Sequence, residues 1–502
     1  MTRAYRIVVS TAIAGAAGLV AVAQPVALVE GHAAAPTHLI VKVRNGVDMQ
    51  PFEEGPGRIG NGPVPTAVVV LQQSGAVASR PLYPAGFAMP GIATGIGLDR
   101  TFVADIGEDA ALTRVLASLR ARPDVFEWVE PDYIVYATDA PNDTHYTRQW
   151  ALENTGQLGG SVDADIDAES AWTVSTGSSG IRVAILDSGI VAGHTEFEGR
   201  VIARNFTSSD PGAWGDDNSH GTHVAGIAAA RGGNERGIAG VCWNCTVVVG
   251  RVLNAAGSGT DSQAAQGLEW AVSQGARVVN MSFSSSVASN TLEDAVLYAF
   301  QSGCLLVASS GNRGSGEPEY PAAFDAVVAV GNTTDRDVIS STSSYGEHLY
   351  LSAPGTSIWS TLPNGDYGYK SGTSMAAPHV SGLAGLVLSV NPSLPPGDVG
   401  TILALTADDL GAPARDQYYG YGRINAGRAM AAVSFPGAWV DFGFAGAGVG
   451  TFVRPYNNLV AGINAVPNGG QVMLKSGSAG AVGVITKPVT LRAWSGTVTI
   501  GG

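Results

Sequence analysis

The chain has 502 residues, of which 45% are hydrophobic and 14% charged, and its formal net charge is -14. So few charges exclude a solvated disordered protein. The negative balance disfavours nucleic acid and anionic lipid surfaces as partners, because both are negative themselves. The three cysteines are too few for a small disulfide-stapled scaffold. At about 100 to 200 residues per domain, the length predicts roughly two to four domains.

The N-terminus has the pattern of a secretory signal peptide. Arg3 and Arg6 precede an uncharged run of apolar and small residues, which closes on the small-residue pattern of a cleavage site at residues 21–23. A permanent membrane helix needs about 20 apolar residues, whereas this run is short and rich in Ala and Gly. We therefore expect removal of residues 1–23, a secreted, extracellular mature protein, and no transmembrane segment after that removal.

A small α+β unit is predicted next. Residues 39–43 have the pattern of a strand, apolar residues at 112–119 recur at helical spacing, and Pro123 ends that helix before a β-rich run at residues 125–136. Residues 138–144 are polar and contain a proline, which suits an exposed linker. The pattern therefore predicts a separate N-terminal unit that ends near this linker.

Beyond residue 181, short apolar runs alternate with helical patterns. The runs suit strands buried on both faces, and the alternation predicts an α/β fold with a parallel sheet flanked by helices. The predicted strands are residues 183–186, 247–253, 278–281, 305–308 and 326–330, and the clearest helices are residues 262–273 and 292–301. Residues 437–502 are rich in Gly, Val and Thr with almost no helical periodicity, which predicts a β-type tail similar to the opening rungs of a β-helix.

Three polar residues stand where an open parallel sheet binds its ligands, beyond the carboxyl ends of the strands. Asp187 directly follows a predicted strand, His220 lies among small residues, and Ser374 precedes an apolar helical pattern. A serine hydroxyl is a weak nucleophile, so it needs an imidazole to take its proton and a carboxylate to hold the imidazole's tautomer. Asn312 follows another apolar strand and is a candidate donor to the oxyanion. The sequence therefore predicts a serine hydrolase.

Other interpretations of these residues have less support. Taken singly, an Asp after a strand is usually a turn residue, a lone His is often structural, and a Ser before a helix is usually a cap. A lipase-like site is disfavoured because no G-x-S-x-G is present, and a zinc site at His220 and His223 is disfavoured because no H-E-x-x-H is present. The combination of the residues is what favours catalysis.

The three segments, in the order Asp, His and Ser, resemble the subtilisin-like serine peptidases. The most specific of them is GTSMAAPH at residues 372–379, and the resemblance covers roughly residues 149–430. It implies a subtilisin-like catalytic domain at residues 138–436 that cleaves peptide bonds through an acyl-enzyme. By the same resemblance Asp187 orients the imidazole, His220 is the general base and acid, Ser374 is the nucleophile, and Asn312 donates to the oxyanion.

The resemblance also implies how a protein or peptide substrate binds. An extended peptide is expected to add as a strand between residues 253–259 and the segment that begins at Ser282. The substrate-binding residues implied are Ser282, Phe283, Ser284, Ser285, Ser309, Ser310, Gly311 and Glu319. Because an opposite charge in a desolvated pocket is selective, Glu319 predicts a preference for Lys or Arg before the scissile bond. The alternative is that Glu319 is a solvated loop carboxylate.

Two further features follow from the resemblance. Residues 24–137 are similar to an inhibitory pro-region, notably at residues 125–132, which implies that the chain's own propeptide blocks the cleft until it is cut near residues 137–142. Calcium is implied as a structural cofactor, because Asp143, Glu196 and Asn234 occupy positions comparable to calcium ligands of relatives. The backbone carbonyls of Arg231, Arg236 and Ile238 would help to complete a shell of about six to eight oxygens. The alternative is that these residues only cap turns.

Cys242 and Cys245 are spaced as C-x-x-C within a protease pattern, so a local disulfide is one possibility and Cys304 is expected as a buried thiol in a strand. The leading interpretation is a secreted serine endopeptidase, made as a self-inhibited precursor and acting as a monomer. A second interpretation is a non-catalytic binding protein that uses the protease fold as a scaffold and recognises a surface polymer with its tail. The presence of all four catalytic residues argues against it, because a binding module needs none of them.

Overall fold

The structure is a computed structural model and describes residues 7–9, 27–29, 32–52, 64–83, 97–106, 112–133, 140–475, 477–479, 485, 487–494 and 498–500. The predicted signal cleavage site at residues 21–23 lies outside these ranges, as do residues 137–139 of the predicted processing segment. Within these ranges one helix, Thr373–Val390, is long and apolar enough to cross a membrane by length and composition, but 83% of it is buried inside the protein, as in a core helix.

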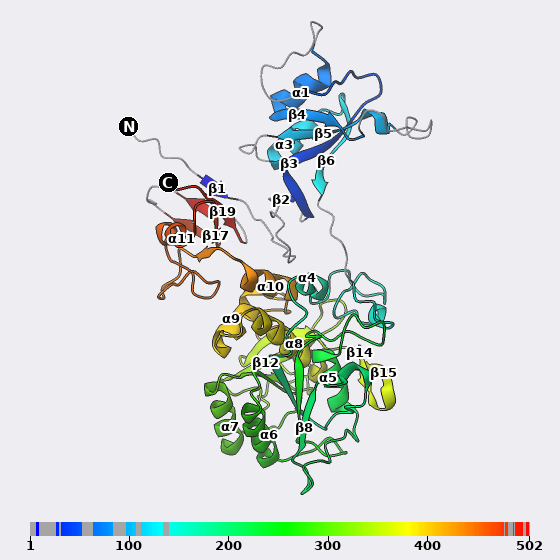
Figure 1. The fold of residues 1–502 in the computed structure, drawn as a ribbon, viewed down its shortest axis with the longest axis vertical. Helices are drawn as coiled ribbons and strands as arrows, with labels where there is room; N and C mark the ends of the chain where they lie inside the picture. Colours follow the sequence, from blue (N-terminus) through cyan, green and yellow to red (C-terminus); the bar gives the residue numbers. More distant parts are fainter. Residues whose placement is uncertain are drawn as a thin grey trace.

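A parallel seven-stranded sheet forms the centre of the largest part of the protein, the lower part in Figure 1. Its order is β13-β12-β11-β10-β7-β9-β8, and each neighbouring pair is parallel. The strands are β7 (Arg182–Asp187), β8 (Val201–Asn205), β9 (Thr246–Arg251), β10 (Val278–Met281), β11 (Leu305–Ser309), β12 (Val327–Thr333) and β13 (Leu349–Pro354). All five predicted strands are present. The two edge strands, β8 and β13, are not among the predictions, because polar or small residues interrupt their apolar pattern.

Helices cover both faces of this sheet, as predicted. Alternate residues of each strand point to opposite faces: Val183 and Ile185 of β7 belong to one hydrophobic core, and Ala184 and Leu186 to the other. The first core includes α4 (Ala168–Trp172), α5 (His220–Ala229), α8 (Thr373–Val390), α9 (Pro396–Thr406) and α10 (Ala426–Ser434); the second includes α6 (Asp261–Ser273) and α7 (Asn290–Gln301). The antiparallel hairpin of β14 (Ile358–Leu362) and β15 (Asp366–Lys370) lies against α5 and leads into α8.

The N-terminal part forms the predicted α+β unit. Its strands are β2 (Ala27–Val29), β3 (His32–Val43), β4 (Ala76–Pro81), β5 (Thr101–Ile106) and β6 (Phe126–Tyr133), paired antiparallel with β3 in contact with β2, β5 and β6. Two helices, α1 (Thr66–Ser74) and α3 (Leu112–Arg120), pack on the sheet and close a hydrophobic core of their own. The unit stands apart from the domain of the seven-stranded sheet in Figure 1.

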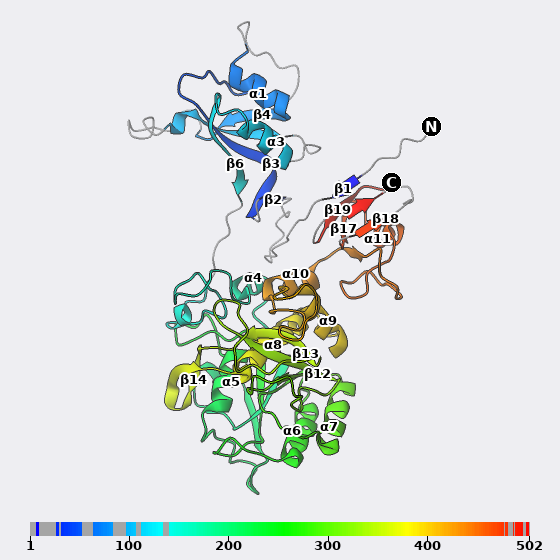
Figure 2. The same ribbon diagram turned by 180° about the vertical axis from the view of Figure 1, so that it is seen from behind.

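The C-terminal segment is mostly β structure and packs on the catalytic domain (Figure 2). The parallel strands β16 (Ala438–Val440), β17 (Gly470–Leu474) and β19 (Val489–Ala493) form one sheet, and β18 (Gly477–Ala479) pairs parallel with β20 (Val498–Ile500), which also pairs antiparallel with β1 (Ile7–Val9). Trp439 and Phe452 are buried in the first core of the catalytic domain. A short helix, α11 (Leu459–Ala465), is absent from the predictions, because two turns provide too little periodicity.

Candidate active site

Asp187 and His220 meet at the carboxyl edge of the sheet. Asp187 is the last residue of β7 and is fully buried, and His220 is the first residue of α5. The His220 Nδ1 atom lies 2.8 Å from Asp187 Oδ1. Gly221 permits this approach, because a Cβ there would lie 2.3 Å from the carbonyl oxygen of Gly189. The two residues predicted from separate segments are therefore hydrogen-bonded.

Asp216, a buried carboxylate that the sequence analysis did not identify, fixes the start of α5. Asp216 Oδ2 accepts hydrogen bonds from the Thr222 backbone N–H and hydroxyl, and its Oδ1 accepts from the Ser219 N–H and the Ser188 hydroxyl. The Ser188 N–H in turn donates to Asp187 Oδ1 at 2.7 Å. Asp216 thus satisfies helix N-terminal donors and ties them to the catalytic carboxylate. The signal in the sequence that could have identified Asp216 is an acidic residue just before the start of a helix.

The surroundings of the two neighbouring histidines give them different properties. Burial lowers the pKa of His220, but the charge and hydrogen bond of Asp187 raise it by more, so the net pKa lies above its ordinary value. Burial lowers the pKa of His223 to about 3, and its Nε2 lies 3.1 Å from the carbonyl oxygens of Ile358 and Gly368. His223 is therefore a neutral structural residue that holds the hairpin, and His220 is the titrating one.

Ser374 lies in the first turn of α8, beside the segment that follows β10. Its hydroxyl donates to the carbonyl oxygen of Ser282 at 3.2 Å, and the Ser282 hydroxyl donates back to the Ser374 carbonyl at 2.9 Å. Within the described residues no hydrogen bond joins Ser374 to His220. Catalytic hydrogen bonds are often formed only when substrate is bound.

Asn312 faces the N-terminus of α8. Its Oδ1 accepts hydrogen bonds from the Thr373 backbone N–H at 2.9 Å and from the Thr373 hydroxyl at 3.1 Å. These bonds turn the amide so that its Nδ2 is left to donate elsewhere. Gly372 lies against this amide, since a Cβ there would lie 3.3 Å from Asn312 Oδ1 and 3.4 Å from Nδ2. The amide and the helix N-terminus together can stabilise negative charge that develops next to Ser374.

Comparison with known proteins agrees with this geometry. Residues 178–422 match the profile of peptidase S8, the subtilase family. Thermitase of Thermoactinomyces vulgaris is 37% identical over 292 residues, which are 58% of this chain and 99% of thermitase. The chain belongs to the subtilase family. A thermophilic serine proteinase of Bacillus sp. strain AK1 is 39% identical over 318 residues, 63% of this chain and 75% of that relative.

A solved structure supports the same conclusion. A protease from Pseudoalteromonas arctica PAMC 21717 matches with a TM-score of 0.53 at 30% identity, over 59% of this chain and the whole of that chain. The fold is therefore that of a subtilisin-like protease, and the protein is a subtilisin-like serine endopeptidase.

In this subtilase the segments predicted to line the primary pocket converge on Glu319. Its carboxylate is only 2% exposed and accepts hydrogen bonds from the hydroxyls of Ser284 at 2.6 Å and Ser344 at 2.8 Å. Arg313, which follows Asn312, places its Nε 3.8 Å from the same carboxylate. Gly311 lies against it, since a Cβ there would be 2.0 Å from Glu319 Oε1. Glu319 is therefore a buried charge and not a solvated loop residue.

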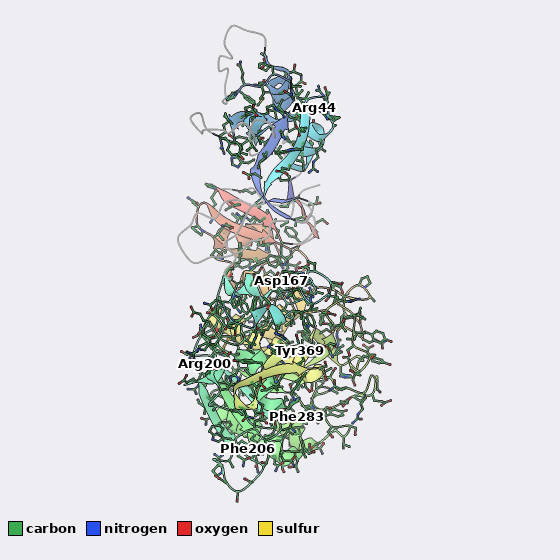
Figure 3. All side chains as sticks on the ribbon, turned by 90° about the vertical axis from the view of Figure 1, so that its right-hand side faces the viewer. Arg44, Asp167, Arg200, Phe206, Phe283 and Tyr369 are labelled. Atoms are coloured by element: carbon green, nitrogen blue, oxygen red, sulfur yellow. A yellow bond between two sulfur atoms is a disulfide. The ribbon has the colours of Figure 1, made fainter. Side chains whose placement is uncertain are left out.

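The other predicted pocket residues have distinct positions. Ser285 and Tyr320 exchange two backbone hydrogen bonds of 2.8 Å, which join the segment that begins at Ser282 to the segment that carries Glu319. Ser310 is buried and donates to the Ser344 carbonyl, so its side chain is structural, and Ser309 is buried as the last residue of β11. Phe283 is half-buried against the second core (Figure 3). Residues 254–258, expected to form an extended edge, instead form a turn.

The predicted calcium residues also come together. Asp143 Oδ2 accepts from the Gly233 N–H at 2.7 Å, and Asn234 Nδ2 donates to Glu196 Oε2 at 3.2 Å. Glu196 Oε1 accepts from the Ile238 N–H and the Tyr367 hydroxyl. The Arg231 N–H donates to the Glu196 carbonyl, and the Arg236 N–H donates to Asn234 Oδ1.

The electrostatics of this cluster fit a cation. Asp143 and Glu196 are both buried, and burial raises the pKa of each. Asp143 Oδ1 is buried without a hydrogen-bond partner. No group of three or more His, Cys, Asp or Glu residues is placed to hold a metal within the described ranges, so an ion here would need amide or carbonyl oxygens beside the two carboxylates.

The structure shows which cysteines are bonded and which is free. Cys242 and Cys245 form a disulfide, the possibility that the sequence left open. Cys304 is a buried free thiol, as expected, but it lies directly before β11 and not within a strand, and it donates to the Ala276 carbonyl. Burial raises the pKa of Cys304 to about 11, so it is not a nucleophile at neutral pH.

Proposed function

We propose that this subtilase is a secreted endopeptidase that works through an acyl-enzyme on Ser374 and is made as a self-inhibited precursor. The observation that carries the catalytic assignment is the 2.8 Å hydrogen bond between His220 and the buried Asp187, together with Ser374 in the first turn of α8, the helix that packs against the helix of His220. A turn residue or a helix cap has no need of this arrangement.

The chemistry follows from the roles of these groups. His220 Nε2 takes the proton of Ser374 while Oγ attacks the scissile carbonyl carbon, and Asp187 stays ionised and holds the other ring nitrogen. Asn312 Nδ2 and the backbone donors at the start of α8 stabilise the oxyanion. His220 then protonates the leaving amine, and water activated by the same imidazole releases the acyl group and restores Ser374.

The primary pocket is proposed to select Lys or Arg through Glu319. Two hydroxyls hold the carboxylate, and its burial prevents water from screening it. Arg313 already lies beside it, so a basic side chain of the substrate has to compete with this guanidinium. The preference for basic residues is therefore set by the balance between Arg313 and the substrate.

Residues 24–137 are proposed to act as the inhibitory propeptide, between a signal peptide at 1–23 and the catalytic domain at 138–436, with 437–502 as a C-terminal segment. The separate core of the unit supports independent folding. The sheet face opposite its helices exposes Trp128 and Glu130 and leaves Ile40 half-buried, so this face is available for docking. Inhibition requires the unit to dock on the catalytic domain.

A structural calcium ion is proposed at Asp143, Glu196 and Asn234, with backbone oxygens of Arg231, Arg236 and Ile238. The unpartnered Asp143 Oδ1 supports it. An ion there would neutralise two buried carboxylates and tie the start of the catalytic domain to the loop at residues 231–238.

Maturation of the secreted protein tests the proposed function. Wild type, Ser374→Ala and the control Ser389→Ala, which changes a serine at the far end of the same helix, are produced with calcium, and their intact masses are measured. We expect wild type and Ser389→Ala to lose the segment that ends between residues 137 and 142, and Ser374→Ala to keep it. Cleavage of all three would show that another protease matures the chain. Cleavage of none would favour the scaffold interpretation.

A further inference from the structure

Lys370 is the only lysine between residues 138 and 436. It is the last residue of β15 and stands four residues before Ser374. Its Nζ donates to the Ser219 hydroxyl at 3.0 Å, and Ser219 directly precedes His220. The hairpin that carries it, including the neighbouring Tyr369 labelled in Figure 3, lies beside α5. The ammonium group is therefore held next to the catalytic imidazole.

The charge of Lys370 has no local counter-ion. Within the described part of the chain, no carboxylate lies within 4.0 Å of its Nζ, whereas Arg251, Arg423 and Arg428 each pair with an Asp. Among the described residues, the ammonium has the neutral Ser219 hydroxyl as its one hydrogen-bond partner, which leaves two of its three donors for another group.

The position of Lys370 defines which part of a substrate it meets. The acyl side of the scissile bond occupies the pocket around Glu319, next to Asn312. His220 must give its proton to the leaving amine, so the residues that follow the scissile bond pass on the His220 side of Ser374. Lys370 is anchored on that side through Ser219.

We propose that Lys370 binds a carboxylate of the substrate on the leaving side, so that the enzyme prefers Asp or Glu in the first two positions after the cleaved bond. An unpaired, half-buried cation attracts a carboxylate more strongly than a fully solvated one does. The inference rests on the proposed function, because it names the substrate class of the same site.

Quenched fluorescent peptides with amidated C-termini test the proposal. One series has an identical acyl side and carries Glu, Gln or Lys in the first or second position after the cleaved bond. We expect wild type to cleave the Glu peptides with kcat/KM about tenfold above the Gln peptides at low salt, mainly through KM, and the ratio to shrink as salt is added. A Gln peptide that ends in a free carboxylate, instead of an amide, shows whether Lys370 binds the C-terminal carboxylate of a peptide as well as it binds a Glu side chain.

Three variants separate this role from a structural one. Lys370→Met removes the charge and is expected to bring the Glu to Gln ratio close to one, whereas Lys370→Arg keeps the charge and retains a preference. Arg454→Gln makes the same change in net charge at a distant ion pair with Asp398 and is expected to leave the ratio as in wild type.

The pH profile on the Gln peptide is a second readout. Lys370 lowers the pKa of His220, while Asp187 and Asp216 raise it. The acidic limb of kcat/KM is therefore expected to move to higher pH in Lys370→Met and to stay in place in Lys370→Arg.

Two results would overturn the proposal. One is that wild type cleaves the Glu and Gln peptides with equal kcat/KM. This result needs no variant, so it does not depend on how Lys370→Met folds. The other is an unchanged ratio in a Lys370→Met protein of unchanged melting temperature. In both, the Gln peptide is still cleaved. Failure of the proposed function differs, because wild type would then cleave no peptide.

Discussion

Glu319 carries its charge where water cannot screen it. The Ser284 and Ser344 hydroxyls each occupy one carboxylate oxygen, and Arg313, with more than half of its side chain exposed, supplies the only cation recorded as an ion-pair partner for it among the described residues. A charge in this position changes binding by far more than the same charge at the surface. We therefore expect substrate choice at this pocket to depend on the buried Glu319 and the exposed Arg313.

We expect Glu319→Gln and Arg313→Gln to change the preference for the residue before the scissile bond in opposite directions. Glu319→Gln should lower the ratio of kcat/KM for a Lys peptide to that for a Leu peptide by about tenfold to a hundredfold, because it removes the buried negative charge. Arg313→Gln should raise the same ratio, because it removes the competing guanidinium. Peptide pairs that differ only before the scissile bond provide the measurement. Equal cleavage after Leu and Lys by all three proteins would contradict this role of Glu319.

The first turn of α5 is the element on which the catalytic geometry depends. Five groups of this turn and its neighbours donate to Asp216, and Gly221 lies against the backbone of Gly189. The obstacle to a side chain at residue 221 is a carbonyl oxygen, so no rotamer change can relieve it. The helix can begin this close to β7 only because the residue after His220 is a glycine.

Gly221→Ala is expected to destabilise the fold by about 1 to 3 kcal/mol and to abolish most activity, because α5 must shift away from Asp187. Thermal unfolding and peptide cleavage provide the two measurements. Gly397→Ala is the matched control, since Gly397 also lies in the first turn of a helix but has open space around its Cβ position. A Gly221→Ala enzyme with wild-type kcat/KM would show that the close approach does not position His220.

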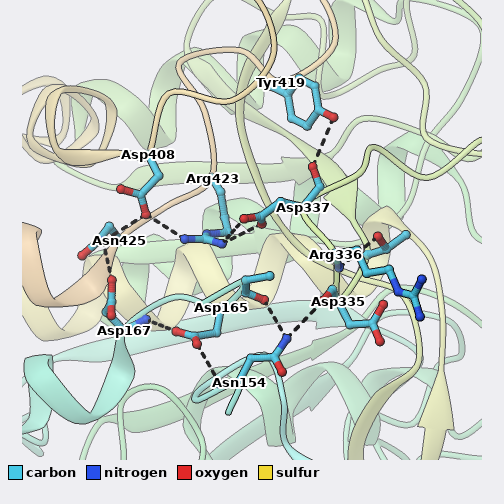
Figure 4. A network of polar contacts seen from close by, with 12 residues as sticks. Asn154, Asp165, Asp167, Asp335, Arg336, Asp337, Asp408, Tyr419, Arg423 and Asn425 are labelled. Carbon is cyan, nitrogen blue, oxygen red and sulfur yellow. Dashed lines mark hydrogen bonds and ion pairs between the residues drawn. The ribbon is translucent and has the colours of Figure 1, made fainter. Parts of the chain in front are cut away.

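At the scale of the whole molecule, a network of acidic residues joins the two ends of the catalytic domain (Figure 4). Asp167, before α4, accepts a hydrogen bond from Asn425, and Asn425 also donates to Asp408. Arg423 pairs with both Asp408 and Asp337. The carboxylates of the network outnumber its two ion-paired arginines, Arg423 and Arg428, so part of the negative charge is not compensated.

The same network makes stability depend on pH. Burial, with the charges of Asp165, Asp163 and Asp408, raises the pKa of Asp167 to about 7, and burial raises the pKa of Asp165 to about 6. In the unfolded chain these groups ionise near pH 4. Between about pH 4 and 7 the folded protein therefore binds more protons than the unfolded chain, and its stability falls as pH rises through that range.

Asp167→Asn should remove part of this penalty. We expect a gain of about 1 to 2 kcal/mol at pH 8 and little change at pH 4, as measured by thermal unfolding at both pH values. Asparagine tolerates the left-handed backbone of this residue, φ 55°, and can still accept from Asn425. Asp408→Asn is the contrasting variant and should destabilise at pH 8, because it breaks ion pairs with Arg423 and Arg428. Equal stability of Asp167→Asn and wild type at pH 8 would contradict the role of the raised pKa.

Calcium removal is expected to lower the melting temperature of the wild type. A ligand at about one hundred times its dissociation constant adds about 2.7 kcal/mol to the stability of the folded state. In Asp143→Asn the difference between calcium and chelator should shrink, whereas Glu235→Gln, an exposed carboxylate of the same loop, should keep it. An unchanged melting temperature of wild type in chelator would count against a structural ion.

The sequence by itself determined the parallel sheet and the family. Buried parallel strands are continuous apolar runs, so β7, β9, β10, β11 and β12 could be predicted, and the order of the three motifs around Asp187, His220 and Ser374 pointed to subtilases. These are local signals, readable within a few residues of each position. The edge strands β8 and β13 and the short helix α11 escaped prediction because their local patterns are weak.

Only the tertiary structure decided what surrounds each of these residues. The bonds of Asp216 to Ser188, of Ser344 to Glu319 and of Lys370 to Ser219 join residues that are 25 to 151 positions apart in the chain. No local pattern specifies such pairs, because they exist only after separate strands and loops have packed. The same holds for Trp439, whose burial in the catalytic core joins the C-terminal segment to the rest of the protein. Local periodicity sets the elements, whereas long-range packing sets the charges and contacts at the site.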